Sequence, residues 1–267
     1  MNLRKYITLT RAGMMESLHF RTSAFVTILG NIIYLVIIYY LWKAIYASTG
    51  TSIVNGMTFE DTMIYLVLAT ALFYFMEMYL VWNMGRDIQS GSIVLKLIRP
   101  MSFKKYMFFS CSGSFVMSFF MTFLPTALIV YFITNGAIYL GSNLVFFLIS
   151  VILGLLINFY VDFFVGTICL YTESIWGINI MKEVVVLLLS GASIPLAFFP
   201  ESLKNVVMVL PFQAIYNTPL NILIRHNLNN FDRITMLGIQ LFWVIILSII
   251  TSLFWKRSVR QITVNGG

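Results

Sequence analysis

The sequence predicts an all-α membrane protein, and three observations carry this prediction. Of its 267 residues, 60% are hydrophobic and 10% are charged, whereas soluble domains carry about 25% charged residues. The mean hydropathy is +0.90. Apolar runs of about 20 residues, the length that crosses a bilayer as a helix, recur along the chain. We therefore expect a single transmembrane domain over residues 1–267, with no separate soluble domain.

Six segments are expected to span the membrane: 23–46, 62–84, 106–133, 143–170, 181–199 and 234–255. The first is longer than the apolar region of a secretory signal, about 7–15 residues, so we expect a retained helix. The fifth is the weakest, because its apolar core VVVLLLSGASIPLAFF is short and has Pro195 near its end. The preceding SIWGINIM is expected to lengthen it.

The distribution of basic residues predicts the orientation. With a cytoplasmic N-terminus, 13 of the 17 Lys and Arg residues fall on the inner side and four on the outer side. Cytoplasmic segments are the ones enriched in Lys and Arg. Both termini are therefore expected in the cytoplasm, and the net charge of +7 is attributed to topology rather than to nucleic-acid binding.

Two segments outside the spans have distinct patterns. Residues 1–21 place apolar residues on one helical face and Arg4, Thr8 and Arg11 on another, which predicts a helix lying in the membrane interface. A disordered tail is the alternative. Residues 200–232 contain Pro200, Pro211 and Pro219 between two apolar pieces too short to span. They predict an external hairpin of two short helices that re-enter the outer leaflet.

The cytoplasmic segment 85–105, which begins GRDIQSGSIVLKLIRP, is basic and partly amphipathic. Gly91 permits a break after the second span, and Pro100 disfavours helix at Arg99. We expect a short helix over roughly 88–98 on the membrane surface. The alternative is an ordinary positively charged loop held by anionic lipid.

This arrangement resembles the permease subunits of ABC-2 type ABC transporters, in particular the bacterial six-span subfamily. The resemblance rests on LWKAIY (41–46), on SGSIVLKLIRPMS (90–102) and on the order of the segments, and it covers nearly the whole chain. It implies an ABC-2 (type V exporter-like) fold and a permease that exports a hydrophobic or amphipathic substrate across the bacterial plasma membrane.

The resemblance also implies partners. Two permeases would pair within the membrane lipid, with a different second permease favoured over a homodimer, and each would dock a cytoplasmic ABC ATPase. The docking residues implied are Gly91, Ile93, Val94, Leu95, Leu97, Arg99 and Pro100. The chain has no G-x-x-x-x-G-K-[ST] motif, so ATP and Mg are expected on the partner and not on this chain. The permease itself is not expected to be an enzyme.

Four residues are candidates for the translocation path. Glu77 and Asp162 lie deep in spans, where a charge costs at least about 2.5 kcal/mol to insert, and no basic residue of this chain is expected at their depth. They are interpreted either as polar points that favour cationic or amphipathic cargo, or as groups near the inner interface, with Asn158 and Tyr160 beside Asp162. Ser193 and Pro195 belong to a flexible or hinged stretch of span five, or serve packing alone.

Other chemistries have weaker support. Cys111 and Cys169 are expected to be buried apolar residues, and no His and Cys spacing predicts a metal site. A secondary transporter is a rival, but no internal repeat is visible. An intramembrane protease would use SGASIP (190–195), yet the last span holds no histidine to act as its base.

Overall fold

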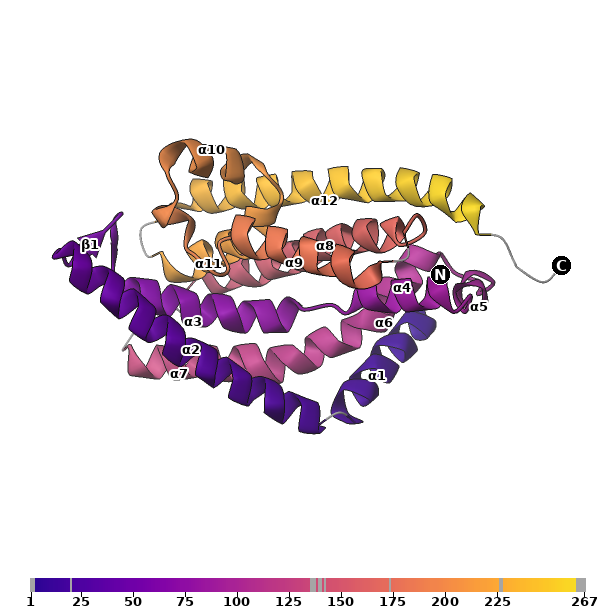
Figure 1. Cartoon of the computed structure of the whole chain (residues 1–267), viewed down its shortest axis with the longest axis horizontal. Helices are drawn as coiled ribbons and strands as arrows, with labels where there is room; N and C mark the ends of the chain where they lie inside the picture. The colour runs from indigo at the N-terminus through magenta and orange to yellow at the C-terminus, as the bar shows by residue number, and fades with distance from the viewer. Residues whose placement is uncertain are drawn as a thin grey trace.

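The computed structural model describes residues 3–19, 21–134, 138, 141, 143–172, 174–225 and 228–262, and for residues 3, 19, 21–25, 27 and 28 the backbone only. These residues form an elongated bundle of helices with one small β-hairpin (Figure 1). The elements are α1 (Leu3–His19), α2 (Arg21–Thr49), β1 (Ile53–Val54), β2 (Met57–Thr58), α3 (Phe59–Met76), α4 (Leu80–Gln89), α5 (Ile93–Leu97), α6 (Phe103–Ser118), η1 (Phe119–Phe123), α7 (Leu124–Ile133), α8 (Asn143–Ile168), α9 (Ile175–Leu189), η2 (Leu196–Phe198), α10 (Glu201–Val209), η3 (Phe212–Ala214), α11 (Asn217–Ile224), α12 (Asn230–Ser258) and η4 (Val259–Gln261).

Within the described residues, five helical stretches are long and apolar enough to cross a membrane: Leu29–Thr49, Phe59–Gln89, Phe103–Ile133, Asn143–Ile168 and Asn230–Gln261. They correspond to the first, second, third, fourth and sixth predicted spans. The prediction of an all-α membrane protein is thereby confirmed, and the count of six spans stays a prediction.

The end of the fifth predicted span, 181–199, was wrong, whereas its expected lengthening through SIWGINIM is confirmed. The helix in this region is α9, which begins at Ile175 and ends at Leu189, so it has 15 residues. At about 1.5 Å per residue it is about 22 Å long, less than the bilayer core of about 30 Å. It ends because Ser190 caps it and Gly191 follows with a φ of 80°. Pro195 therefore lies beyond the helix and not inside it.

The second span is divided. A capping box between Thr58 and Asp61 starts α3. The helix stops at Met76, because Glu77 is extended with a ψ of 123°, and α4 starts at Leu80. Figure 1 shows the non-helical link between the two half-helices. The side chain of Asn158 on α8 donates to the carbonyl of Met76 at 2.9 Å and satisfies one backbone acceptor that the break exposes.

The third span is interrupted near Pro125. Proline lacks a backbone N–H and clashes with the preceding turn. The structure absorbs this with a π-helical turn, Phe119–Phe123, directly before α7.

A helix within residues 1–21 is confirmed over Leu3–His19, and its place at the membrane interface stays a prediction. It packs along α6, where Gly13 and Gly113 allow the backbones to meet. A hydrogen bond of 2.7 Å joins the hydroxyls of Thr10 and Ser112 across this contact. The segment is thus an integral part of the bundle.

The two ends of the bundle carry different elements (Figure 1). The start of α1, α5 and the end of α12 lie at one end, while the β-hairpin, α10 and α11 lie at the other. This agrees with the predicted grouping of both termini with segment 85–105. Two short helices in 200–232 are confirmed as α10 and α11, and their re-entry into a leaflet stays a prediction.

The β-hairpin was not predicted. Its turn is Asn55-Gly56, with φ values of 50° and 79°, the geometry that Asn-Gly favours in a two-residue hairpin. Among the predicted apolar cysteines, Cys169 is buried and both are free.

Candidate functional site

The first candidate site is the turn between α4 and α5. Helix α4 ends at Gln89 with Ser90 as its C-cap, and Gly91 has a φ of 72°, a left-handed conformation that glycine adopts without strain. The amide of Gly91 donates to the carbonyl of Ile88 at 3.2 Å. The predicted break at Gly91 is confirmed, and the following helix is shorter than expected, Ile93–Leu97 rather than 88–98.

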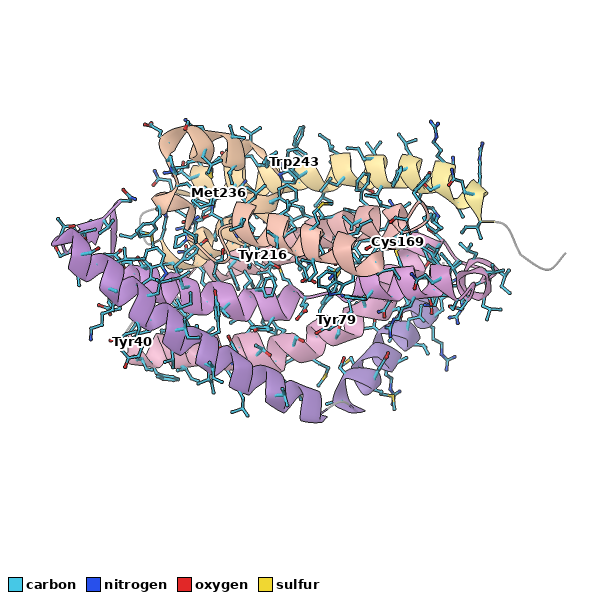
Figure 2. All side chains as sticks on the ribbon, in the orientation of Figure 1. Tyr40, Tyr79, Cys169, Tyr216, Met236 and Trp243 are labelled. Carbon is cyan, nitrogen blue, oxygen red and sulfur yellow. The ribbon has the colours of Figure 1, made fainter. Side chains whose placement is uncertain are left out.

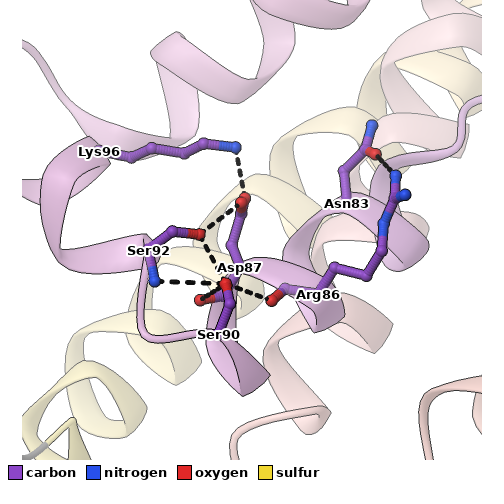
Figure 3. Close-up of polar contacts among 6 residues, drawn as sticks. All are labelled: Asn83, Arg86, Asp87, Ser90, Ser92 and Lys96. Carbon is purple, nitrogen blue, oxygen red and sulfur yellow. Dashed lines mark hydrogen bonds and ion pairs between the residues drawn. The ribbon is translucent and has the colours of Figure 1, made fainter.

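Asp87 holds this turn together (Figure 3). Its carboxylate forms an ion pair with Lys96 on α5 and accepts a hydrogen bond of 3.1 Å from the Ser92 hydroxyl. The hydroxyls of Ser90 and Ser92 are 2.8 Å apart. An ion pair and side-chain hydrogen bonds therefore join α4 to α5 across Gly91. We expect the two helices to move together.

The implied ATPase-docking residues do not all face outward. Leu95 is 64% exposed, whereas Ile93 is 2% exposed and belongs to the hydrophobic core. Val94 and Leu97 are half-buried against the same core. Successive helical positions point to different faces and Ile93 occupies the inner one, so its contact with a partner stays a prediction.

Residues after α5 tie the turn to the rest of the bundle. The exposed Arg99 guanidinium lies 4.5 Å from the ring centroid of Tyr106 on α6. The ammonium of Lys5 on α1 donates to the carbonyl of Pro100 at 3.2 Å. Ile98, at 74% exposure, is a further exposed apolar side chain three residues after Leu95. We call Leu95 and Ile98 the exposed apolar pair.

The second candidate site is a charge cluster beside the α3–α4 break. The ammonium of Lys182 on α9 lies 3.0 Å from Oδ1 of Asp162 on α8, which is fully buried. The expectation that no basic residue lies at the depth of Asp162 was therefore wrong. Lys182 is the second residue of the expected span 181–199, but α9 starts seven residues before it and carries it deeper into the bundle.

Glu77 and Glu183 complete this cluster. The carboxylate of Glu77 interacts electrostatically with Glu183, Lys182 and Asp162. The side chain of Tyr79 forms a hydrogen bond with it. The amide of Asn179 donates to Glu183 at 2.5 Å. Figure 2 shows Tyr79 at the gap between the two half-helices. Three carboxylates thus lie in one region, and the ammonium of Lys182 contacts that of Asp162.

The other two predicted path residues lie elsewhere. Ser193 follows α9, and its hydroxyl donates to the carbonyl of Leu187 at 3.3 Å. Pro195 lines a cavity with Tyr65 and Asn217 near the β-hairpin. The structure therefore brings Glu77 and Asp162 together but does not bring Ser193 or Pro195 to them.

The remaining chemistries can be compared with this geometry. Within the described residues, no group of three or more His, Cys, Asp or Glu side chains could hold a metal ion. His226, the histidine that follows SGASIP in the sequence, lies outside the described residues. The Ser193 hydroxyl donates its proton to a backbone carbonyl. A serine nucleophile would instead donate this proton to a side-chain base.

The comparison with known families decides the assignment. Residues 32–266 match the family described as ABC-2 family transporter protein. The chain belongs to this family. No curated protein matches the chain. The match makes it a permease, the membrane component of an ABC transporter, and implies association with ABC ATPase subunits. The matched range includes every element after the first turns of α2, and thus both candidate sites, whereas α1 precedes it.

The charges on α9 and the hydrogen bond of Asn158 could both have been predicted from the sequence. Lys182 and Glu183 lie inside the apolar run of α9. Charged side chains within a membrane usually pair with another polar group. Asn158 lies in another such run, and an amide there commonly serves a free backbone group.

Proposed function

We propose that the permease is half of an ATP-driven exporter that moves a hydrophobic or amphipathic substrate across the bacterial plasma membrane, with both termini cytoplasmic. A separate ABC ATPase holds ATP and Mg. The observation that carries the proposal is the exposed apolar pair, Leu95 and Ile98, on a turn braced by Asp87 and Lys96. Exposed apolar side chains on a rigid protrusion are the kind of surface that binds another protein.

The packing of α4 provides a route for motion from this turn to the spans. Gly85 lets α4 approach Ile175 at the start of α9, where an added Cβ would lie 2.7 Å from the isoleucine side chain. Gly166 on α8 accommodates Met84 in the same way, at 2.8 Å. A displacement of α5 is therefore transmitted through α4 to α8 and α9, while the break at Glu77 separates it from α3.

The charge cluster around Lys182 and Asp162 supports the proposal that polar side chains line part of the substrate path. Glu77 is partly exposed, whereas Asp162 is buried and neutralised by Lys182. A cationic group of an amphipathic cargo would be attracted to Glu77 at this break. A second permease would complete the path, and a different chain is favoured over a second copy.

The docking proposal is tested by co-expressing the permease with candidate ABC ATPases from its host, then measuring complex yield and ATP hydrolysis in vesicles. Leu95→Asp should abolish both the complex and the stimulated hydrolysis, because it places a charge in an apolar contact. Ile53→Asp is the matched control, since Ile53 is 59% exposed but lies on the β-hairpin at the other end.

Equal complex yields for the two variants would overturn the docking surface. Export in vesicles should require ATP and the second polypeptide. Transport driven by an ion gradient without the ATPase would instead support a secondary transporter, whose broken helices the α3–α4 break resembles.

A further inference from the structure

A cavity of about 510 Å³ opens at the end of the bundle that carries the β-hairpin. Four regions form it: the hairpin turn, the first turns of α3, the segment before and within η2, and α11 with the residues after it. Its volume lies in the range of about 300–1,000 Å³ typical of ligand sites. The question is which ligand its walls match.

The floor of the cavity is a fixed polar network. The hydroxyl of Tyr65 donates to the carbonyl of Gly191 at 3.0 Å and lies 3.4 Å from the side-chain oxygen of Asn217. The side-chain amide of Asn221 donates to the backbone and side-chain oxygens of Asn217, at 2.8 and 2.9 Å. Tyr65 and Asn217 are buried, so this network is ordered before any ligand arrives.

Two opposite charges line the same cavity. Asp61 contributes a carboxylate, which the Thr58 backbone amide and hydroxyl fix through hydrogen bonds of 3.1 and 2.7 Å. Arg225, the residue that ends α11, contributes a guanidinium. The charged lining is therefore neutral overall and carries one group of each sign, which disfavours a ligand with a large charge of a single sign.

The Arg225 side is the more cationic of the two. A smaller recess of about 130 Å³ shares Asn217, Asn221 and Arg225 with the main cavity and adds Lys204 on α10. Guanidinium groups bind phosphate oxygens in a bidentate manner. An anionic phosphate would therefore lie near Arg225, and an ammonium near Asp61.

The other lining residues carry no polar side chain: Gly56, Met57, Pro195, Leu196, Ala197, Ile224 and Leu228. A ligand with a zwitterionic part and an apolar part would satisfy both kinds of wall. The cavity lies among the elements at one end of the spanning helices, where lipid headgroups meet a bilayer-embedded protein.

We infer that this cavity binds a phosphoethanolamine group, with the phosphate on Arg225 and the primary ammonium on Asp61. The group has two sources, the headgroup of a membrane lipid and a free glycerophosphoethanolamine. The inference goes beyond export and does not depend on the ATPase or on the identity of the cargo.

The test uses the purified full-length permease in nanodiscs of phosphatidylethanolamine, phosphatidylcholine or phosphatidylglycerol, diluted into a neutral carrier lipid. Thermal unfolding and lipid retention by native mass spectrometry are measured. Phosphatidylethanolamine should raise Tm and be retained above the other two, because only its headgroup offers both a phosphate and N–H donors. A parallel titration in detergent with glycerophosphoethanolamine separates the sources: protection there shows that the free group suffices, and protection by the lipid alone assigns the site to a bilayer lipid.

Two variants link the effect to the cavity. Arg225→Gln and Asp61→Asn should each weaken binding about tenfold, the loss of one charge-assisted hydrogen bond. Asparagine keeps an acceptor for the Thr58 cap, so Asp61→Asn should still fold. Glu60→Gln and Lys43→Gln make the same charge changes at exposed positions that do not line the cavity, and should have no effect. Equal Tm and retention for the three lipids, or undiminished selectivity in both cavity variants, would overturn the inference.

Discussion

Lys182 and Asp162 form an ion pair between two helices in the interior of the permease, with 3.0 Å between the ammonium and Oδ1. The carboxylate is fully buried and the lysine side chain is 11% exposed. The pair lies beside the α3–α4 break and joins α8 to α9, a helix too short to cross the bilayer alone. The positive charge of Lys182 compensates the negative charge of Asp162, which allows the carboxylate to be buried inside the bundle.

Removing one partner of this pair should destabilise the permease strongly. Lys182→Met leaves the Asp162 carboxylate buried without its counter-ion, and such changes cost about 3–5 kcal/mol. The double variant Lys182→Met with Asp162→Leu should recover most of the loss, because no charge remains. Thermal unfolding in detergent measures both, with the exposed Lys256→Met as control. A double variant as unstable as the single one would show that the pair is not the source of the effect.

A second prediction concerns Gly113 at the contact of α1 with α6. A Cβ at this position would lie 2.3 Å from the carbonyl of Thr10 and from the amide of Met14, both of them backbone atoms. Gly113→Ala should therefore displace α1 and lower stability by about 1–3 kcal/mol. Gly238→Ala, where a Cβ meets nothing within 4 Å, is the matched helical control. Limited proteolysis should show α1 cleaved faster in the first variant only.

Lys104 gives a third prediction, with a control one residue away. Its ammonium donates to the carbonyl of Ser248 at 3.0 Å and to the hydroxyls of Thr251 and Ser252 at 3.0 and 2.5 Å. These bonds join the start of α6 to α12. Lys104→Met should lower stability by about 2 kcal/mol through lost charge-assisted hydrogen bonds. The exposed Lys105 should tolerate the same change, and equal melting temperatures for the two variants would contradict the assigned role.

The fold was predictable where the signal was local. Apolar runs revealed five stretches of spanning length, and Gly91 and Pro125 marked real departures from α-helix, because backbone preference resides in the residue itself. The β-hairpin could also have been foreseen from Asn55-Gly56.

The missed features depend on pairs of residues far apart in sequence. The break after Met76 has no glycine or proline, and is accommodated in part by Asn158 on another helix. The partner of Asp162 is twenty positions away on another helix, α9. That Ile93 faces inward and Leu95 outward follows from how α5 lies on the bundle, which periodicity over five residues cannot determine.

A fourth prediction tests the backbone of the turn. Gly91 has a φ of 72° and open space around it, so any cost of substitution comes from the backbone alone. Gly91→Val should cost about 1–2 kcal/mol, whereas Gly91→Asn should cost less, since asparagine tolerates the left-handed region. Stimulated ATP hydrolysis in the reconstituted complex should follow the order Gly, Asn, Val. Equal hydrolysis for asparagine and valine would show that this conformation is not needed for docking.

The fifth prediction separates the brace of the turn from its docking surface. Asp87 pairs with Lys96 and accepts from Ser92, so Asp87→Asn keeps an acceptor for the serine but removes the charge that holds the lysine. The pair is partly exposed, so its contribution to global stability should be below about 1 kcal/mol. Its effect should instead appear as weaker coupling, because α5 then moves independently of α4. We expect Asp87→Asn to lower ATP-driven transport more than it lowers complex yield.

Leu95→Asp provides the comparison, since it should lower yield and transport together. The charge-reversed pair, Asp87→Lys with Lys96→Asp, should restore part of the transport that Asp87→Asn loses, as an ion pair forms again with opposite polarity. Raising the ionic strength should weaken coupling in the wild type and leave Asp87→Asn unchanged, because a partly exposed pair is screened by salt. Identical salt dependence in both proteins would mean that motion passes from α5 to α4 through the apolar contacts of Ile93 alone.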